Sequence, residues 1–408
     1  MGSNLPLILS LRDRATGCDS IHRSSLSYKA ITTELKLETS GLSVCSRQFF
    51  LQFLGRKNVR DLTQSASGAH LKHRFLQEER LQLKRLINLN PSSDSEINAG
   101  SDVIQGLTQI PKSLPPKYFY NDRGSELFEA ICKLPEYYPT RTEAAILRDY
   151  AGEIAQRTGA CELVELGSGS STKTRLLLDA YEALDYPLHY VPIDVSAGIL
   201  ESSAKQLLAD YPSLQVHGLV STYEAALQQL APAQLPTRMI FFLGSTLGNL
   251  SPQECDLFFS QITAALNVGE YFLLGVDLQK PKHLLESAYN DRQGVTAEFN
   301  LNMLEHLNQR FGGNFDTQLF EHWAFYNEKL HQIEMHLRSL KAHTVRLEAL
   351  DLTVNFEVGE TIMTEISRKF DLSIVQEELQ AKGLKPLQVW TDSKNWFGLI
   401  LCQLQTLI

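Results

Sequence analysis

The fold of this 408-residue chain is decided by the stretch CELVELGSGSS (residues 161–171), in which an apolar strand pattern runs directly into a turn of glycine and serine. We expect residues 161–166 to form a strand and a helix to follow over about 172–184. Glycines at such a turn let the backbone approach a ligand without a clash from Cβ atoms. The stretch therefore predicts the first strand, turn and helix of an α/β domain that binds a ligand beside the turn.

The alternation of strand and helix patterns continues on the C-terminal side of this stretch. Apolar runs predict further parallel strands at residues 189–194, 214–220, 238–244 and 270–278, with a helix over 197–211. Such alternation indicates a doubly wound sheet with helices on both faces. Towards the C-terminus we predict antiparallel strands over 331–339, 343–351 and 352–358, then a helix over 374–382 and two strands over 384–392 and 396–404.

The first 98 residues differ from the rest of the chain. They carry Ser-rich and Arg-containing stretches with weak periodicity, and only residues 76–90 (LQEERLQLKRLINLN) read as an amphipathic helix. Residues 91–102 are a loop or linker by composition. Two interpretations of this extension stay open, a poorly ordered start and an organellar targeting peptide.

Composition excludes several classes of protein. The formal net charge is −9, and no dense Lys/Arg stripe is present, so we expect no binding to nucleic acid or to an anionic membrane. The six cysteines form no CxxC pair, and no apolar run approaches the roughly 18 residues of a membrane span. His322, His331, His336 and His343 lie at spacings that match no metal-binding pair. We expect a cytoplasmic protein without a metal site.

The turn favours a nucleoside ligand without phosphates. A dinucleotide fingerprint places a third glycine where this chain has Thr172. Asp194, at the end of the second predicted strand, is suited to take both ribose hydroxyls, or it is a simple strand-end cap. Lys173 either contacts a carboxylate of the cofactor or is a surface lysine at a helix N-terminus.

The predicted fourth strand leads into FLGSTLGNLSP (residues 242–252). In an open α/β sheet, ligands lie outside the carboxyl ends of the strands, so Gly244 and Asn249 are expected beside the reacting group of the cofactor. If the nucleoside carries a sulfonium, as a methyl donor does, transfer to an amine would need a neutral nucleophile in line with it, and no metal. An amide or phenol that holds the amine lone pair in place would serve.

Several longer strings resemble the histidine Nα-methyltransferase family of the ergothioneine pathway. The strings are PKSLPPKYFY (111–120), LPEYYPTRTEA (134–144), LVELGSGSS (163–171), FLGSTLGNL (242–250), AYND with GVTAEFN (288–300) and GETIMTEISRKF (359–370). The resemblance implies an α/β fold, with a Rossmann-like class I methyltransferase domain and a second, smaller α+β substrate-binding domain. It places the amino-acid domain at residues 99–140 and 280–367, and the S-adenosylmethionine (SAM) domain at 141–279 and 368–408.

Position by position, the resemblance implies which residues bind the cofactor. Gly167, Lys173 and Asp194 match cofactor-binding positions of the family. Where the family has an Asp–Phe pair, this chain has Thr222 and Tyr223. Threonine can bond the adenine amino group through its oxygen, but more weakly than a carboxylate, so this part of the predicted site departs from the family pattern.

The resemblance also implies a set of residues around the amino acid. Asn249 and Tyr289 match residues that hold the amine and carboxylate, and Tyr120 matches a tyrosine near the reacting amine. The imidazole ring is assigned to Tyr137, Met335, Glu365 and Ser367. A carboxylate with a hydroxyl suits a ring that has one donor and one acceptor, or two donors. For each tyrosine the alternative is core packing with a bonded hydroxyl.

The sequence thus predicts a monomeric enzyme that methylates the α-amino group of L-histidine with SAM. The resemblance implies three successive transfers, which give the trimethylated betaine hercynine for ergothioneine biosynthesis. Three alternatives stay open. They are a relative that acts on another amino acid such as a tryptophan derivative, an NAD-dependent oxidoreductase, and a non-catalytic binding module.

Overall fold

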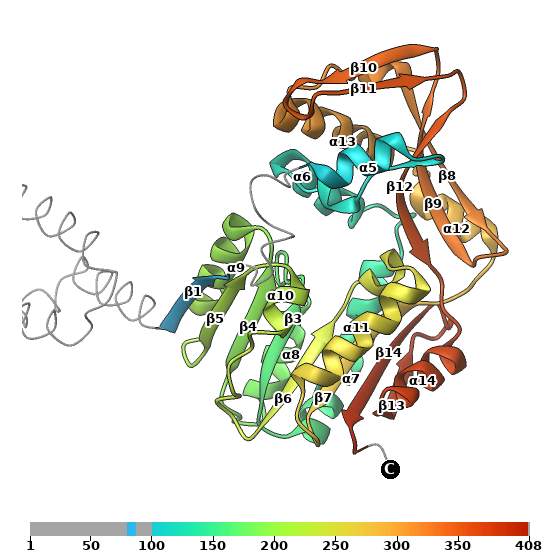
Figure 1. Cartoon of the computed structure of the whole chain (residues 1–408). Coiled ribbons are helices and arrows are strands. Elements are labelled where there is room, and N and C mark those ends of the chain that lie inside the picture. Colours follow the sequence, from blue (N-terminus) through green and yellow to red (C-terminus); the bar gives the residue numbers. More distant parts are fainter. Residues whose placement is uncertain (1–79, 87–99, 407–408) are drawn as a thin grey trace, which may run out of the picture. The chain divides into compact units, whose positions relative to one another are not determined.

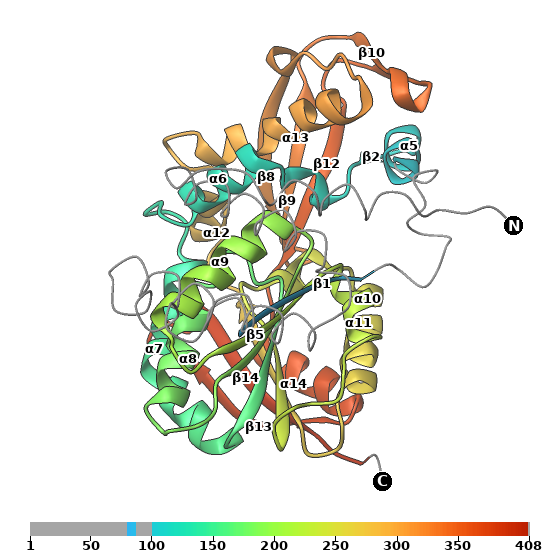
Figure 2. The same ribbon diagram turned by 90° about the vertical axis from the view of Figure 1, so that its left-hand side faces the viewer.

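The structure is a computed structural model that describes residues 80–86 and 100–406, within one compact unit, Gln77–Ile408. An eight-stranded sheet is its largest element (Figures 1 and 2). Its strands in spatial order are β1 (Leu81–Arg85), β5 (Gln215–Val220), β4 (His189–Asp194), β3 (Cys161–Leu166), β6 (Thr237–Phe242), β7 (Tyr271–Asp277), β14 (Phe397–Leu404) and β13 (Leu384–Thr391). Neighbours from β1 to β7 pair in parallel, and β14 runs antiparallel to β7 and β13.

The direction in which strands are added to the sheet reverses at β3. The chain builds β4 and β5 on one side of β3, and then β6 and β7 on the other. This topology confirms the α/β, Rossmann-like fold class predicted from the sequence. In such a sheet, ligands bind outside the carboxyl ends of the strands at the point of reversal, which here lies between the loops after β3 and β6.

Helices cover both faces of the sheet. Successive strand side chains point to opposite faces, so Leu163 and Val164 of β3 belong to two different apolar clusters. The first cluster is closed by α7 (Pro139–Thr158), α8 (Thr174–Glu182) and α9 (Ala197–Asp210), and the second by α10 (Tyr223–Leu227), α11 (Pro252–Ala265) and α14 (Leu372–Ala381). Burial on both faces explains why β3 is apolar enough to be recognised from the sequence.

A second core is built from two segments that are far apart in the sequence, coloured cyan and orange in Figure 1. Its four-stranded sheet has the order β2 (Lys112–Ser113), β12 (Thr361–Arg368), β9 (Gln332–Ser339) and β8 (Phe320–Asn327). The remaining elements are α5 (Ser101–Thr108), η2 (Pro116–Phe119), α6 (Asp122–Ile131), α12 (Lys282–Tyr289), α13 (Val295–Phe311), η4 (Thr317–Leu319), η5 (Glu348–Leu350) and the hairpin β10 (His343–Leu347) with β11 (Leu352–Phe356).

The helix predicted over residues 76–90 is wrong where the structure describes it, because Leu81–Arg85 form strand β1. This strand pairs in parallel with β5, and Leu83 lies over Gly218, whose missing side chain leaves the space. Arg80 donates hydrogen bonds to backbone carbonyls beyond the end of α9, including that of Pro212 at 2.9 Å. Tertiary pairing has overridden a local helical pattern. The rest of the predicted extension, residues 1–79 and 87–98, lies outside the described residues.

Other predicted elements differ mainly at their ends, but the helices α5, α10 and α11 were not predicted, and no element was predicted between residues 280 and 330. There the structure has α12, α13 and β8. Alternation of strand and helix, the pattern used for the sheet, no longer applies in this insertion, because its elements belong to a separate core.

Candidate active site

The turn after β3 presents bare backbone to solvent. Gly167 and Gly169 have φ angles of 71° and 47°, and Ser171 has a φ of 52°. A Cβ atom at either glycine would meet no other atom within 4 Å, and Gly167 is exposed. This is the geometry expected where a ligand lies directly against the main chain.

Asp194 ends β4 beside this turn. Its Oδ2 accepts a hydrogen bond from the Gly169 N–H at 2.9 Å, and its Oδ1 accepts one from the Ser196 N–H at 2.8 Å. The strand-end cap considered as the alternative is therefore present. A carboxylate offers about four acceptor positions, so both oxygens keep the capacity to accept from the hydroxyls of a ribose.

Two other polar side chains of the turn differ in how they are bonded. Glu165 is buried and accepts hydrogen bonds from Thr174 Oγ1 at 2.6 Å and from Tyr190 OH. Burial raises the pKa of Glu165 to about 7, although these two bonds oppose the shift. Ser168 Oγ is buried and has no partner within the described part of the chain. Glu165 therefore ties the turn to its neighbours, whereas Ser168 keeps its capacity for a ligand.

Lys173, directly before α8, forms an ion pair with Glu143 of α7. Glu143 is fully buried, and both of its oxygens accept from the Gly244 N–H at 2.9 Å. Gly244 itself has a φ of 78° and is exposed. The pair explains why a cation is tolerated at a helix N-terminus. Lys173 is thus not a freely solvated surface lysine, and its contact to the cofactor stays a prediction.

Thr222 and Tyr223 follow β5, the strand that pairs with β4. Thr222 Oγ1 caps α10 by accepting from the Ala225 N–H at 3.5 Å. Tyr223 packs its ring against Phe242 and Phe258, with centroid distances of 5.7 and 5.6 Å. The capping bond leaves the Thr222 proton available, so the predicted adenine contact is compatible with the structure and stays a prediction.

The loop after β6 brings the two sheets together. In η3 (Thr246–Asn249), a Cβ atom on Gly248 would lie only 2.9 Å from the Arg368 carbonyl oxygen of β12. Glycine is the residue that permits this approach. The next residue, Asn249, hydrogen-bonds through its amide to the carboxylate of Glu365. Two residues predicted from separate motifs, 116 positions apart (365 − 249), are therefore neighbours.

Glu365 lies on β12 and is partly buried. Burial raises the pKa of its carboxyl group to about 7, and the charge of Lys369 and the bond from Asn249 oppose the shift. Met335, predicted to line the ring pocket, is buried and lies opposite Glu365 in the register of β9 and β12. A carboxyl group that is held in a desolvated place is suited to a ligand that supplies a compensating donor.

Ser367 belongs to a buried network of hydrogen bonds. Its Oγ accepts from Tyr289 OH at 2.8 Å and from Lys369 Nζ at 2.8 Å, and Lys369 also donates to Tyr289 OH at 3.0 Å. Burial raises the pKa of Tyr289 above its ordinary value. The Tyr289 hydroxyl is thus committed to Ser367 and Lys369, and its predicted role with the backbone of the amino acid stays a prediction.

Two aromatic residues complete the predicted set. Tyr137 is partly buried and meets the ring of Tyr289 edge-on at 6.1 Å. Tyr120 keeps 46% of its surface accessible. Desolvation by the surrounding protein nevertheless raises its pKa, and the charges of Glu365 and Asp194 add to the rise. Tyr120 therefore lies within electrostatic reach of both the predicted cofactor carboxylate and the predicted ring carboxylate.

The sequence reasoning did not single out three residues that organise this region, namely Glu143, Asp277 and Lys369. Asp277 accepts from Tyr138 OH at 2.7 Å and forms ion pairs with Lys369 and Lys280. Each residue had a feature in the sequence that could have pointed to it. Glu143 is an acid on the apolar face of a helix, and Asp277 is an acid at the end of a buried strand. Lys369 lies two residues after Ser367, which itself lies two residues after Glu365, so alternation along the strand places all three on one face.

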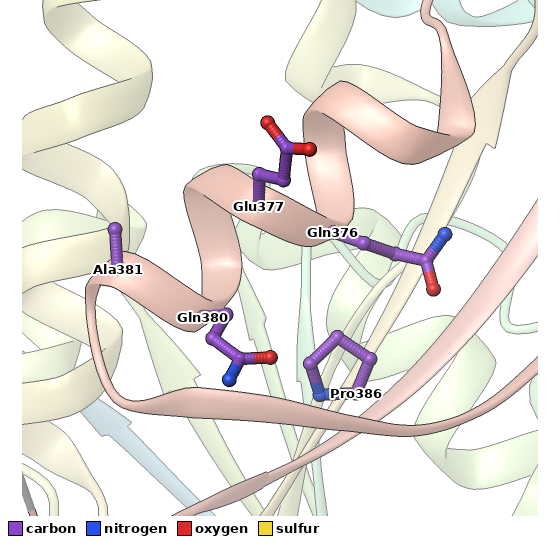
Figure 3. A pocket seen from close by; sticks show the side chains of 5 residues that line it. All are labelled: Gln376, Glu377, Gln380, Ala381 and Pro386. Carbon is purple, nitrogen blue, oxygen red and sulfur yellow. The ribbon is translucent and has the colours of Figure 1, made fainter.

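Other features of the described residues carry no candidate chemistry. Within residues 80–86 and 100–406, no group of three or more His, Cys, Asp or Glu side chains could hold a metal. No helix in this part of the chain is long and apolar enough to cross a membrane. A surface hollow between α14 and β13 (Figure 3) is lined by Gln376, Glu377, Gln380, Ala381 and Pro386, none of which is a predicted site residue.

The polar groups and bare backbone at the turn fit a nucleoside cofactor that carries no phosphates. A carboxylate at Asp194, bare backbone at Gly167 and an unbonded hydroxyl at Ser168 offer acceptors and close approach to a sugar. Lys173, the cation that follows the turn in the sequence, is already paired with Glu143. Phosphates would call for unpaired cations or a run of free backbone N–H groups.

Comparison with known proteins identifies the family. Residues 99–404 match the family described as histidine-specific methyltransferase, SAM-dependent. A histidine N-alpha-methyltransferase of Mycolicibacterium smegmatis is 46% identical over 300 residues, which are 74% of this chain and 93% of that protein. A second one, from Mycobacterium tuberculosis, is 44% identical over the same shares. Ergothioneine biosynthesis protein 1 of Neurospora crassa is 31% identical over 71% of this chain, and the match covers 33% of that protein.

These matches set aside the oxidoreductase and the non-catalytic module, and they make SAM the cofactor. The chain belongs to the SAM-dependent, histidine-specific methyltransferase family.

Proposed function

We propose that this enzyme transfers methyl groups from SAM to the α-amino group of L-histidine. The observation that carries the proposal is the position of Glu365 and Ser367, which lie on one face of β12 next to Asn249 at the carboxyl edge of the SAM sheet. The relatives named histidine N-alpha-methyltransferase support the same substrate. We further propose three successive transfers, which yield hercynine for ergothioneine biosynthesis.

The chemistry of the proposal asks little of the protein beyond positioning. SAM, when bound, supplies the electrophilic methyl group. The amine must be neutral to react, although its ordinary pKa is near 8. Asn249 and Tyr120 are the polar groups placed to orient it, and the protein packed around Tyr120 disfavours charge at this place. Orientation and exclusion of water then account for most of the acceleration.

The proposed domain boundaries follow the three apolar clusters. The cluster of the amino-acid part draws on residues from Val103 to Tyr138 and from Leu285 to Ile362. The two clusters of the SAM part draw on Ile146 to Leu278 and on Phe370 to Leu404, together with Leu86. We therefore propose the amino-acid domain at 99–140 and 280–367, and the SAM domain at 141–279 and 368–408 with β1 added to it.

A tryptophan derivative is the second candidate substrate. An indole offers one N–H donor and no basic nitrogen, so it would use Glu365 and leave the proton of the Ser367 hydroxyl without an acceptor. The proposal of histidine rests on this difference. We also propose that the enzyme is a cytoplasmic monomer that does not bind nucleic acid, which light scattering, cell fractionation and a filter-binding assay would test.

The test is a calorimetric titration of each of the twenty free amino acids into protein saturated with S-adenosylhomocysteine, followed by a turnover assay. We expect histidine alone to bind and to be methylated, with a trimethylated product by mass spectrometry. Binding of tryptophan instead would keep the methyltransferase and overturn the assignment of Glu365 and Ser367. A monomethyl product at long reaction times would contradict the three transfers.

A further inference from the structure

The hydroxyl of Ser367 is saturated with donors from the protein. A serine hydroxyl has two lone pairs and one proton. Tyr289 OH and Lys369 Nζ each donate to Ser367 Oγ at 2.8 Å, so both lone pairs are used. The proton of this hydroxyl meets no acceptor among the described residues. It must therefore be offered to whatever lies beside Ser367, and the hydroxyl can donate but not accept.

Buried contacts hold Lys369 in the orientation in which it donates to Ser367 and so keeps the Ser367 hydroxyl a donor. Its side chain is 1% exposed, and its ammonium forms an ion pair at 2.9 Å with Asp277, which is also 1% exposed. Burial works against the charge of Lys369, but Asp277 and Tyr289 more than offset it and raise the pKa of the ammonium. Lys369 therefore stays charged, and its three protons go to Asp277, Tyr289 and Ser367.

The buried groups next to Ser367, namely Asp277, Lys280 and Lys369, carry a net positive charge. Asp277 is shared by two buried cations, because Lys280 also pairs with it at 2.5 Å. Burial lowers the pKa of Lys280 to about 8, so it is still mostly protonated at neutral pH. One carboxylate between two ammonium groups leaves an excess positive charge. On the Ser367 side of the ring this excess disfavours a protonated nitrogen, whereas the carboxylate of Glu365 on the other side accepts an N–H from the neutral ring.

We propose that Lys369 is a specificity-determining positioning residue, which fixes Ser367 as a hydrogen-bond donor so that the site accepts the neutral imidazole of histidine in a single tautomer. The nitrogen lone pair of the ring faces Ser367, and its N–H faces the carboxylate of Glu365. This inference rests on the proposed function, and it adds the protonation state of the substrate. The titratable and charged groups around Glu365 and Ser367 are Lys369 directly after β12, Asp277 and Lys280 behind it, and the phenols of Tyr120, Tyr137 and Tyr289.

The test is the nitrogen NMR spectrum of ring-¹⁵N-labelled histidine bound to the enzyme with S-adenosylhomocysteine, followed from about pH 8 down past the ordinary histidine pKa of about 6.5. We expect one pyridine-type and one pyrrole-type nitrogen, retained below the pH at which free histidine becomes charged. Two pyrrole-type nitrogens in the wild-type complex would mean an imidazolium and would overturn the inference.

Two variants separate the role of Lys369 from a general loss of buried charge. In Lys369→Met the Ser367 hydroxyl is free to turn and accept, so we expect the bound ring to take up a proton at higher pH than in the wild type. Affinity for histidine should fall about 10- to 100-fold, the range of one charged hydrogen bond. Lys280→Met removes the other cation of Asp277 but leaves the bond from Lys369 to Ser367 in place, so the pH at which the bound ring takes up a proton should shift less than in Lys369→Met.

The remaining outcomes are also informative. If Lys369→Met binds the same neutral tautomer as the wild type, the inference is wrong. If Lys369→Met does not fold, Ser367→Ala tests the same point, since removal of the hydroxyl should likewise let the ring become charged, and an unchanged spectrum would overturn the proposal. Absence of histidine binding to the wild-type enzyme would overturn the proposed function itself, whereas a bound but charged ring overturns only the inference.

Discussion

The cofactor side and the ring side of the candidate site are built in different ways. At the turn after β3, the carboxylate of Asp194 is held by backbone N–H groups from its own strand end and the neighbouring turn. On β12, Ser367 is held by side chains, one of them from Tyr289, 78 positions away in the sequence. The first arrangement follows from local backbone geometry, and the second exists only after two segments of the second core have packed together.

The largest effect is expected on the cofactor side. Asp194→Asn removes the charge that would accept from two ribose hydroxyls, so affinity for S-adenosylhomocysteine should fall about 100-fold or more, since bonds to charged groups contribute roughly 1.5–3 kcal/mol each. Calorimetry measures this loss. Glu165→Gln is the matched control, because Glu165 lies before the same turn but is bonded within the protein. Equal losses in the two variants would contradict the ribose assignment.

A change on the ring side should weaken binding of histidine and leave binding of the cofactor product unchanged. Glu365→Ala should weaken binding of histidine by about 2–3 kcal/mol, the scale of a charge-assisted bond lost from a desolvated site. Affinity for the cofactor product should stay as in the wild type. Glu334→Ala is the control, since Glu334 lies on the neighbouring strand but bonds to Asn327 and Gln332 instead. If Glu365→Ala weakens both ligands equally, the two sides are not separate.

The buried acid before the turn should make stability depend on pH. The pKa of Glu165 is raised by burial to about 7 in the folded protein from its ordinary value of 4.5, so the folded state binds this proton more tightly than the unfolded state. Stability from this group is present at low pH and is lost as the pH rises from about 4.5 to about 7.

Glu165→Gln removes that dependence. In denaturant unfolding, the free energy of unfolding of the variant should increase relative to that of the wild type as the pH rises, by on the order of 3 kcal/mol at most. Glu201→Gln, at an exposed position paired with Lys205, should show no such trend. A difference between Glu165→Gln and the wild type that does not vary with pH would refute the assignment.

The smallest effect is expected at the sheet edge. A chain that begins at Gln77 keeps β1, whereas one that begins at Ala99 loses the pairing of β1 with β5 and the bonds of Arg80 to carbonyls in the last turn of α9 and just beyond it. We expect both chains to methylate histidine, with a lower melting temperature for the shorter one. Equal melting temperatures would show that β1 contributes nothing to the sheet.

Prediction from the sequence succeeded where a local pattern suffices. The strand over Cys161–Leu166 and the strand over His189–Asp194 were predicted with the bounds that the structure has. Their burial on both faces and the glycine turn between them leave a continuous apolar run and a clear end. The candidate residues beside these strands, Gly167 and Asp194, were within reach of the same reasoning.

Prediction failed where distant contacts decide. Residues 81–85 satisfy a helical pattern, and the open edge of β5 makes them a strand. Lys173 could not be distinguished from a surface lysine, because its partner Glu143 lies 30 positions away on another helix. Resemblance to a family supplied Glu365 and Ser367, but it did not point to Lys369.

By itself, the sequence determined the parallel sheet, the glycine turn and the carboxylate at the end of the second predicted strand, because each depends on residues that are adjacent in the chain. Only the tertiary structure decided the neighbours of those residues. The approach of Gly248 to β12 and the sharing of Asp277 between Lys280 and Lys369 depend on how the insertion packs against the loop after β6. Whether the Ser367 hydroxyl donates or accepts is set by its two partners together, and one of them, Tyr289, lies in a distant segment of the chain.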